Sequence, residues 1–272
     1  MQYRLNKEKI QQVCRRYKEG ENSITLSKKF NISDVAIRGL LKRRNIIVRP
    51  QWLAQRKCYF DENIFDILAP EVMYWIGFLF ADGTIVKREK NSSILALVVS
   101  SKDKEHIVKF KKFLKSTHKI IHIKFRNHPN YSAERLAINS TKFANRLHQL
   151  GLYSKLRSKA SPELVSSPHF WRGVVDGDGW IGIANNKYKY PLLQLVGGYQ
   201  LLSQFLEYIY NIVPNYKGSI NPHKTIFSIS LRGNTAYKII DTLYSEAPIS
   251  LERKFNAAQN ILQFGQLNMV GT

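Results

Sequence analysis

A nine-residue stretch that occurs twice constrains this chain more than any other feature of its sequence. WIGFLFADG at Trp75–Gly83 returns as WRGVVDGDG at Trp171–Gly179, with Trp, Gly, Asp and Gly in the same four places. A repeat of this kind predicts a duplicated structural unit in which each copy contributes an equivalent element. We therefore expect two similar halves.

Each copy reads as a short apolar helix with one face of small residues. Gly77 and Ala81 stand four residues apart, as do Gly173 and Gly177, so the members of each pair lie above one another on a helix. Glycine inside a helix costs about 0.5–1 kcal/mol relative to alanine, and close contact between two helix backbones is the physical reason to keep it. The pattern predicts that the two helices cross each other.

An aspartate ends each of these helices. Asp82 and Asp178 precede Gly83 and Gly179, which we expect to be left-handed C′ caps. A carboxylate at a helix C-terminus is unfavourable by up to about 1 kcal/mol, and two carboxylates held together must share a proton or bind a cation. Paired carboxylates suit Mg²⁺ or Ca²⁺. A hairpin turn is the alternative for a single Asp-Gly, but the shared apolar pattern before both copies disfavours it.

These residues carry a resemblance to a known family. Met73–Gly83 resembles the signature of LAGLIDADG homing endonucleases, and Trp171–Gly179 resembles its second copy in the single-chain, two-motif members. The resemblance covers roughly residues 60 to 265 and implies an α+β fold with two αββαββα repeats in a pseudo-twofold saddle. Phe80 departs from the signature, which has an acid there. Asp176 keeps that acid in the second copy only, so we assign it no catalytic role.

The resemblance also implies the parts of an active site. Asp82 and Asp178 would be the shared catalytic acids and metal ligands, joined by the backbone carbonyls of Ala81 and Gly177. Mg²⁺ is the expected ion, with Ca²⁺ or Mn²⁺ as substitutes. A basic residue at a matching distance after each motif is expected to organise water or offset phosphate charge. Lys159 and Lys254 fit that distance, with Lys155 as the alternative in the first half.

The composition limits the class of partner. The chain has 42 Lys and Arg against 20 Asp and Glu, a net charge of +22, which is typical of a protein that binds a polyanion, most often nucleic acid. A ribosomal or membrane-surface protein would have a similar charge. Two isolated cysteines, Cys14 and Cys58, indicate neither a disulfide framework nor a zinc site. No apolar run approaches the roughly 18 residues of a membrane span, and the N-terminus lacks the apolar core of a secretory signal. We therefore expect a soluble, intracellular protein, in a bacterial or phage cytoplasm or in an organelle.

Residues 1–48 are predicted to form a separate, all-α domain. Apolar spacing indicates helices over residues 6–19, 23–30 and 34–44, with Ser33 as the N-cap of the third. A short helix, a tight turn and a basic helix resemble a helix-turn-helix unit, whose second helix enters the major groove. The alternative is a small basic bundle used for packing or solubility. The candidate DNA contacts are Ser33, Asp34, Val35 and Arg38 for bases and Lys42, Arg43 and Arg44 for phosphates.

Residues 49–69 are predicted to be a linker, 70–160 the first half and 161–272 the second. Within each half the pattern predicts helix, two strands, helix, two strands and helix. Strands are expected at 84–87, 94–100, 119–126 and 133–139, and at 180–184, 192–196, 218–221 and 225–231. Helices are expected at 103–116, 141–150, 200–212, 235–245 and 251 to about 264.

Alternating side chains indicate sheets with one buried face. Ile121, Ile123 and Phe125 are expected to point inward in the first half, and Phe227, Ile229 and Leu231 in the second. The polar outer faces would then lie along DNA, although an ordinary solvated face has the same pattern. The histidines His106, His118 and His128 are expected at the surface. The candidate DNA contacts of the two sheets are Arg88, His122, Lys124, Arg126, Arg135, Asn139, Ser228, Ser230 and Arg232.

The resemblance thus implies a site-specific DNA endonuclease that makes a metal-dependent double-strand break. Because the two halves differ in sequence, it implies a monomer that reads an asymmetric double-stranded DNA target of about twenty base pairs or more. The alternatives on the same fold are an RNA-splicing maturase, whose partner is intron RNA, and a non-catalytic DNA-binding regulator. A structural nucleic-acid protein with no active site is a third alternative.

Overall fold

The computed structural model describes residues 5–49, 58–88, 92–184 and 189–269. The chain divides into two compact units, Met1–Tyr59 and Phe60–Thr272. Both cysteines, Cys14 and Cys58, are free thiols. Among the described residues, no helix is long and apolar enough to cross a membrane.

Three helices make up the first unit: α1 (Lys7–Lys18), α2 (Ser23–Phe30) and α3 (Asp34–Arg43). Asn6, Asn22 and Ser33 cap them by accepting a hydrogen bond from a backbone N–H in the first turn, so the predicted Ser33 cap is confirmed. Asn31 ends α2 in the left-handed conformation, which turns the chain sharply into α3. The unit has its own core, formed by Val13, Tyr17, Leu26, Ile37, Leu40 and Leu41.

Arg49 attaches the C-terminal end of this unit to the end of α1. Its guanidinium donates to the carbonyls of Tyr17 and Gly20, both at 2.9 Å, and to that of Glu21, and it lies 4.2 Å from the centre of the Tyr17 ring. These carbonyls stand at the end of α1, where backbone acceptors lack helical partners. Residues 50–57 of the predicted linker lie outside the described residues. From Phe60 onward, the predicted linker packs into the second unit, because Phe60 and Phe65 are buried in its core.

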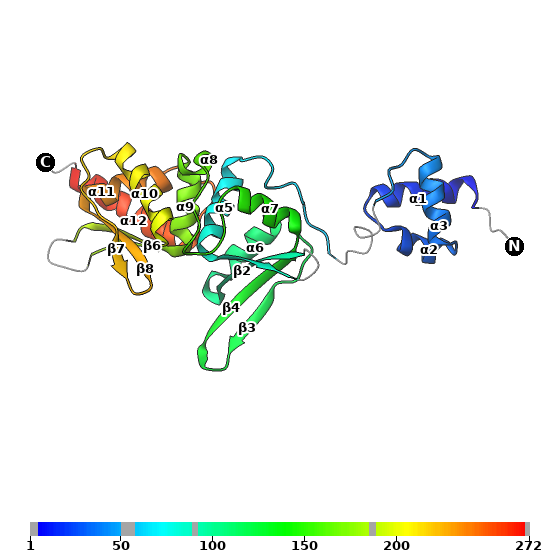
Figure 1. The fold of residues 1–272 in the computed structure, drawn as a ribbon, viewed down its shortest axis with the longest axis horizontal. Coiled ribbons are helices and arrows are strands. Elements are labelled where there is room, and N and C mark those ends of the chain that lie inside the picture. Colours follow the sequence, from blue (N-terminus) through cyan, green and yellow to red (C-terminus); the bar gives the residue numbers. More distant parts are fainter. Residues whose placement is uncertain (1–4, 50–57, 89–91, 185–188, 270–272) are drawn as a thin grey trace. The chain divides into compact units, whose positions relative to one another are not determined.

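The second unit contains the two predicted halves (Figure 1). The first half runs α5 (Pro70–Asp82), β1 (Gly83–Lys87), β2 (Ser93–Ser100), a 3₁₀ turn η1 (Ser101–Asp103), α6 (Lys104–Phe113), β3 (Ile121–Phe125), β4 (His128–Asn139) and α7 (Thr141–Gln149). The second runs α8 (Pro162–Val165), α9 (Pro168–Asp178), β5 (Gly179–Ile183), β6 (Pro191–Gly197), α10 (Tyr199–Ile212), β7 (Asn221–His223), β8 (Ile226–Arg232), α11 (Gly233–Tyr244) and α12 (Glu252–Met269). The α+β class and the αββαββα order are confirmed.

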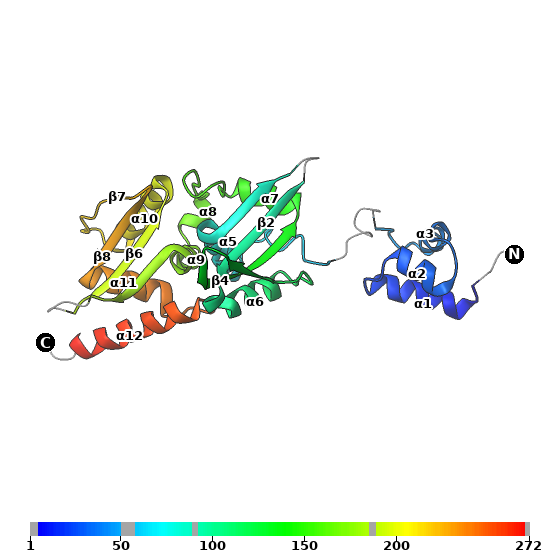
Figure 2. The same cartoon turned by 90° about the horizontal axis from the view of Figure 1, so that it is seen from below.

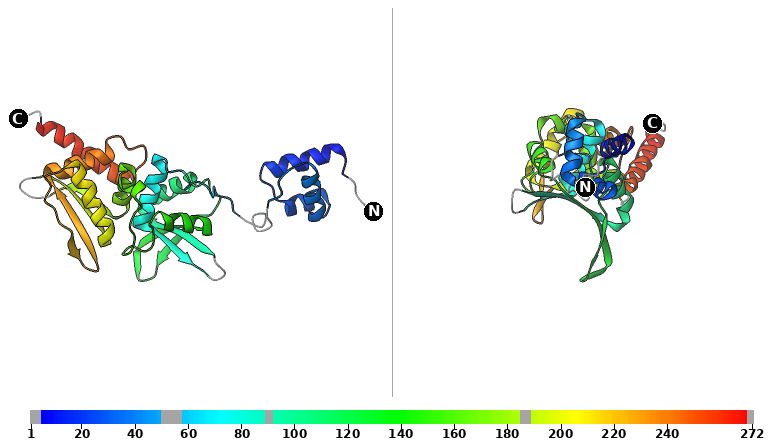
Figure 3. Two further views of the ribbon diagram at one scale, coloured as in Figure 1. Left: turned by 45° about the horizontal axis from the view of Figure 1, so that its top comes forward. Right: turned by 90° about the vertical axis from the view of Figure 1, so that its right-hand side faces the viewer.

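Each half folds its strands into one antiparallel sheet, with the orders β1-β2-β4-β3 and β5-β6-β8-β7. The helices lie on one side of the unit and the strands on the other, as the turned views show (Figures 2 and 3). Leu95, Leu97 and Leu136 in the first sheet, and Leu195 and Ile229 in the second, are buried on the side of the helices. The opposite side of each sheet, called the outer face below, is not covered by these helices.

Motif helices α5 and α9 pack directly against each other at the middle of the unit (Figure 1). A Cβ atom added to Gly77 would lie 2.0 Å from the carbonyl oxygen of Phe170, and one added to Gly173 would lie 2.0 Å from that of Tyr74. No side chain fits in either place, so the predicted crossing through glycine faces is confirmed. The aromatic rings of Trp75 and Trp171 are fully buried on either side of it.

The expected C′ caps are wrong. Gly83 has φ −79° and ψ 147°, and Gly179 has φ −91° and ψ 167°, so both are extended. Each helix passes straight into the first strand of its sheet. These glycines are required for space, because an added Cβ would lie 2.5 Å from the carbonyl oxygen of Leu79 or 2.6 Å from that of Val175.

The prediction of which side chains point into the core is correct for the second sheet and wrong for β3. Ile229 and Leu231 are fully buried, whereas Ile121 is 53% exposed and Phe125 is 37% exposed. Ile121 pairs with Arg135 and His122 pairs with Glu134, which places His122 on the side of the helices and both isoleucines of β3 on the outer face. Strand β3 is an edge strand in a hairpin that extends away from the helices (Figure 1), so little apolar cover reaches it.

Candidate functional site

The two motif aspartates meet where α5 and α9 end. Gly177 lies so close to α5 that an added Cβ would be 2.2 Å from the Ala81 Cβ and 3.3 Å from Asp82 Oδ2. Burial, together with the neighbouring charge of Asp178, raises the pKa of Asp82 to about 6. Burial also raises the pKa of Asp178. The helix crossing therefore holds two carboxylates in a place where their negative charge is poorly solvated.

Two lysines adjoin this acid pair. Lys155 Nζ lies 2.5 Å from Asp178 Oδ1, and Lys254 Nζ donates to the carbonyls of Val175 at 2.7 Å and Asp176 at 2.6 Å. Lys254 is only 3% exposed, and this burial lowers its pKa to about 8. Lys159, by contrast, has an exposed side chain. The structure thus brings Lys254 and the alternative candidate Lys155 to the acids, and Lys155 pairs with the acid of the second repeat.

Asp176 is a structural residue. It is fully buried and accepts hydrogen bonds from the hydroxyls of Tyr74 at 2.7 Å and Tyr244 at 2.6 Å and from the backbone N–H of Leu251 at 2.6 Å. This network ties α5, α11 and the start of α12 to α9. Its carboxylate is turned into the core, which agrees with assigning it no catalytic role.

His106 is not a surface residue as expected. It is 3% exposed, and its Nε2 lies 2.9 Å from the Tyr74 hydroxyl. Its ring also contacts Trp75 and Phe78, with ring centres 4.8 and 4.7 Å apart. Burial lowers the pKa of His106 to about 3, so it is neutral at physiological pH. The expectation failed because the apolar face of α6 includes His106 as its first turn packs on α5.

The acid pair fits a divalent cation in its chemistry. Asp82 and Asp178 offer carboxylate oxygens, and Ala81 and Gly177 lie in the last turns of their helices, where carbonyls have no partner within the helix. Oxygen ligands of this kind suit Mg²⁺ and Ca²⁺. Over the described ranges no group of three or more His, Cys, Asp or Glu residues could hold a metal. A cation here would therefore depend on two carboxylates, backbone carbonyls and water.

The raised pKa of Asp82 predicts a pH-dependent stability change. The pKa of Asp82 in the folded protein, about 6, exceeds the ordinary 3.8. Below pH 3.8 the carboxyl is protonated in both the folded and the unfolded state, so it does not lower the free energy of unfolding. Above pH 6 it is ionised in both states, and the unfavourable buried charge lowers the free energy of unfolding by its full amount. Without divalent cations, Asp82→Asn should raise the free energy of unfolding by about 1–3 kcal/mol at pH 8 and change it little at pH 4. Urea unfolding at both pH values measures this. Asp66→Asn, at an exposed ion pair with Lys142, is the control, and an equal gain at both pH values would contradict the idea.

The predicted DNA contacts of the sheets fall into two groups. Ser228, Ser230 and Arg232 line the outer face of the second sheet, since they alternate with the buried Ile229 and Leu231. Arg135 and Asn139 are on the outer face of the first sheet, paired with Val98 and Ile94. Arg88 follows β1 and is exposed.

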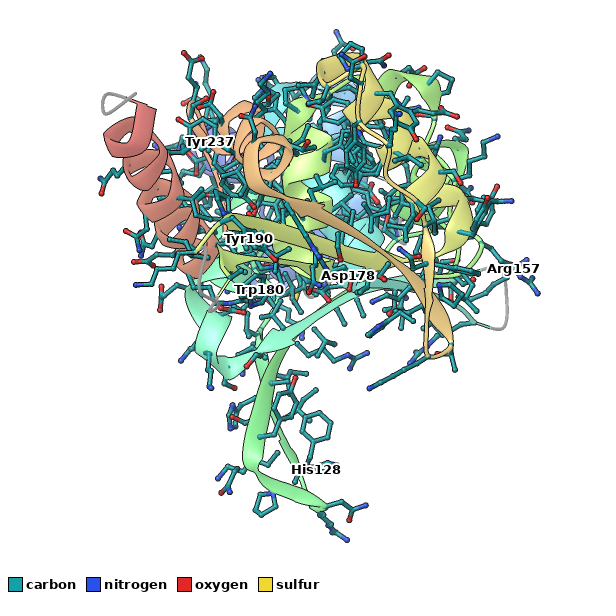
Figure 4. The ribbon with its side chains drawn as sticks, turned by 90° about the vertical axis from the view of Figure 1, so that its left-hand side faces the viewer. His128, Arg157, Asp178, Trp180, Tyr190 and Tyr237 are labelled. Atoms are coloured by element: carbon teal, nitrogen blue, oxygen red, sulfur yellow. The ribbon has the colours of Figure 1, made fainter. Side chains whose placement is uncertain are left out.

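The other three predicted contacts differ from this pattern. His122 Nδ1 donates to the Glu134 carboxylate Oε1 at 2.7 Å on the side of the helices, and Lys124 is exposed beside Ser132. Arg126 lies in the turn of the β3–β4 hairpin. His128, at the end of this hairpin, is far from Asp178 and Trp180 (Figure 4). The hairpin arm therefore carries basic side chains well away from the acid pair.

In the first unit, helix α3 presents the predicted contacts unequally. Val35 is 72% exposed, and Lys42, Arg43 and Arg44 are exposed as well. The Ser33 hydroxyl accepts from the Ala36 N–H at 3.1 Å, and Asp34 pairs with Arg38 at 2.6 Å. The side chains of Ser33 and Asp34 therefore already have partners within the helix. The exposed candidates for contact with DNA are Val35 at its first turn and the cations at its C-terminal end.

Sequence reasoning missed several residues on the outer face of the second sheet. Trp180 follows Asp178 by two residues, is 48% exposed and lies over Gly182, where an added Cβ would be 2.5 Å from its ring. Gln194 pairs with Trp180 and donates to the Ser230 hydroxyl at 3.1 Å. Gln194 is the one polar residue in the apolar run Leu192–Val196, and that interruption was the signal that could have identified it. The Asp103–Arg253 ion pair, with Nε–Oδ1 3.0 Å, joins the two halves and had no signal in the sequence.

Comparisons with known proteins agree with this architecture. The model of the LAGLIDADG-like domain matches residues 69–151, so the resemblance expected from the motifs is confirmed. A comparison with curated proteins found no match. Among solved structures, the LAGLIDADG meganuclease I-AabMI bound to uncleaved DNA is 15% identical with a TM-score of 0.53, over 75% of this chain and 92% of that one.

Two further structures have the same fold. The LAGLIDADG homing endonuclease I-GzeII in complex with its DNA target is 12% identical, with a TM-score of 0.52 over 75% of this chain and 92% of that one. The homing endonuclease I-WcaI bound to its DNA recognition sequence is 18% identical, with a TM-score of 0.51 over 68% and 85%. At these identities the likeness shows the fold, and the chain therefore has the same two-domain α+β fold as these structures.

Proposed function

We propose that this protein is a site-specific DNA endonuclease that makes a double-strand break in a long asymmetric target and requires a divalent cation. The observation that carries the proposal is the acid pair, Asp82 and Asp178, held together at the crossing of two glycine-faced helices. The net charge of +22 supports a polyanionic substrate. Proteins of the same fold that are bound to DNA support duplex DNA as that substrate.

Asp82 and Asp178, with the carbonyls of Ala81 and Gly177, would hold Mg²⁺, for which Mn²⁺ or Ca²⁺ could substitute. When bound, such an ion stabilises charge on a phosphoryl oxygen and lowers the pKa of a coordinated water. The Asp82 carboxyl, with its pKa of about 6, is mostly ionised at pH 7 to 8 and able to serve as a ligand.

The two lysines act by charge. Lys254 has a pKa of about 8, so it is mainly protonated at neutral pH, and its two carbonyl partners keep its ammonium at the end of α9. From there it offsets the negative charge of a phosphate beside the acids. Lys155 forms an ion pair with Asp178 when no substrate is present. Because its side chain is 43% exposed, it can move from Asp178 to a phosphate of the bound substrate. Lys159 has no such position in its favour, so we propose Lys155 in its place.

One chain supplies both halves and both acids, which supports action as a monomer on a target of about one helical turn per half. The outer faces of the two sheets carry different side chains, which supports an asymmetric target. The decisive experiment is selection of cleaved molecules from a randomised DNA library in Mg²⁺, followed by cleavage of a plasmid that contains the selected site. Failure to enrich any site, together with tight binding to structured intron RNA, would favour the maturase.

We further propose that helix α3 of the first unit contacts DNA. Replacing Lys42 and Arg43 together by alanine should weaken binding about equally for all sequences and lower the slope of log K against log salt by about 0.9 for each lost phosphate contact. The matched control is Lys7→Ala with Lys18→Ala, which removes two exposed charges from α1 of the same unit. If both pairs change the slope equally, α3 has no special role and the small basic bundle is favoured.

A further inference from the structure

The outer faces of the two sheets differ in chemistry. In the first sheet, cross-strand pairing joins Val86 to Ile94 and Val98 to Arg135, which pairs in turn with Ile121. Val86 is 46%, Val98 37% and Ile121 53% exposed. Ala96, Ala137 and Ile123 belong to the same face. Arg135 and Asn139 are the long polar side chains within this band of aliphatic side chains.

The second sheet is mainly polar at the matching positions. Gln194 pairs with Ser230, Val196 with Ser228, and Leu192 with Arg232. Asn221 pairs with Ser228 at the edge. Gln194 Nε2 donates to Ser230 Oγ at 3.1 Å, so these side chains form a hydrogen-bonding surface. The aliphatic residues of this face, Leu192 and Val196, are only partly exposed, and its one large exposed apolar side chain among the described residues is Trp180. The first sheet therefore exposes mainly aliphatic side chains at its outer face, and the second mainly amide, hydroxyl and guanidinium groups.

The aliphatic band lies beside exposed cations. Lys87 ends β1 and Arg88 follows it, and Lys124 and Arg126 lie on the hairpin beyond Ile123. A protein partner would have to bury these charges, whereas DNA pairs them with phosphates on either side of a groove. The aliphatic band is thus suited to contact base edges at the floor of a DNA groove, and the cations beside it are suited to contact the phosphates of the DNA backbone. In the major groove only one base carries an apolar group, the C5-methyl of thymine.

We infer that the first sheet reads a thymine-rich half-site through methyl contacts with Val86, Val98 and Ile121, and that the second sheet reads its half-site by hydrogen bonds. This inference rests on the proposed function. Arg135, between Val98 and Ile121 on the same face, has the side chain that pairs with guanine O6 and N7. The first half-site should therefore combine thymines with a guanine–cytosine pair.

Replacing thymine by deoxyuridine in the selected target removes only the methyl group and uses the wild-type protein. Each contacted methyl that is lost in the first half-site should weaken binding about three- to fourfold, the value for one buried methylene, and two or three together about tenfold or more. The same replacement in the second half-site should have a smaller effect. Competition binding at constant salt measures both.

Variants identify which half-site belongs to the first sheet. Val98→Thr with Ile121→Thr keeps the β-branched shape on an exposed strand surface, and a repeated library selection should then lose thymine enrichment in one half-site only. Ser228→Ala with Ser230→Ala is the matched control and should relax the other half-site. Uridine replacement without effect in either half-site, or unchanged thymine enrichment in the threonine variant, would overturn the inference while leaving cleavage intact. No selection or cleavage by the wild-type protein would overturn the proposed function itself.

Discussion

Asp82→Asn and Asp178→Asn are each expected to reduce double-strand cleavage of the selected target by roughly a hundred- to a thousandfold, the usual cost of losing one group that stabilises charge in the transition state. Asparagine has the shape of aspartate but lacks its charge, so it binds a divalent cation poorly. Because burial opposes ionisation of both carboxyls and raises the pKa of each, neither substitution should destabilise the fold.

The measurement is the fraction of supercoiled plasmid converted to nicked and linear forms with time in Mg²⁺. Asp66→Asn removes an exposed carboxylate that pairs with Lys142 and should cleave like the wild type. Binding of the target by both active-site variants should stay within a few-fold of the wild type, which separates chemistry from recognition. Undiminished cleavage by both variants would refute the assignment of the acid pair.

Gly173→Ala is expected to destabilise the second unit by about 3 kcal/mol or more, at the upper end of the cost of overpacking a core. The added Cβ would lie 2.0 Å from the carbonyl oxygen of Tyr74 and 2.7 Å from the backbone nitrogen of Phe78. Both atoms belong to the backbone of α5, so no side-chain rotation relieves the overlap. The two helices must separate, and the two acids with them.

Urea unfolding followed by tryptophan fluorescence measures this, because Trp75 and Trp171 are buried beside the crossing. Gly39→Ala is the matched control. It lies inside α3, where an added Cβ has no atom within 4 Å, so it should be neutral or stabilise the first unit by about 0.5–1 kcal/mol. If Gly173→Ala changed the free energy of unfolding of the second unit no more than Gly39→Ala does, the helices would tolerate wider spacing.

Local patterns in the sequence predicted most of the elements. Ser23–Phe30 was predicted to the residue, and the strands differ by one to a few residues at their ends, with the largest shift at the start of β4, which begins at His128 and not at residue 133. Apolar spacing succeeds in these elements because each buries one face against a single neighbour. Duplication of the motif also predicted the crossing and the pairing of Asp82 with Asp178.

Strand β3 shows where local patterns fail. Ile121, Ile123 and Phe125 alternate as a buried face would, yet the pairing of Ile121 with Arg135 turns them outward, and the register shifts between Lys124 and Phe125. Because side chains alternate every residue, a register different by one residue exchanges the two faces. Alternation therefore predicts that two faces exist, and the pairing decides which one is buried.

The sequence by itself determined the class of fold, the order of elements, the two halves and the pair of acids, since these follow from periodicity and from a motif that is repeated along the chain. Only the tertiary structure decided that Lys155 and Lys254, and not Lys159, adjoin the acids, that His106 is buried, and that one outer face is aliphatic and the other polar. These outcomes depend on contacts between residues far apart in sequence, such as Lys155 with Asp178 and Tyr74 with Asp176. Strand register and helix packing set such contacts, and neither is encoded in a local pattern.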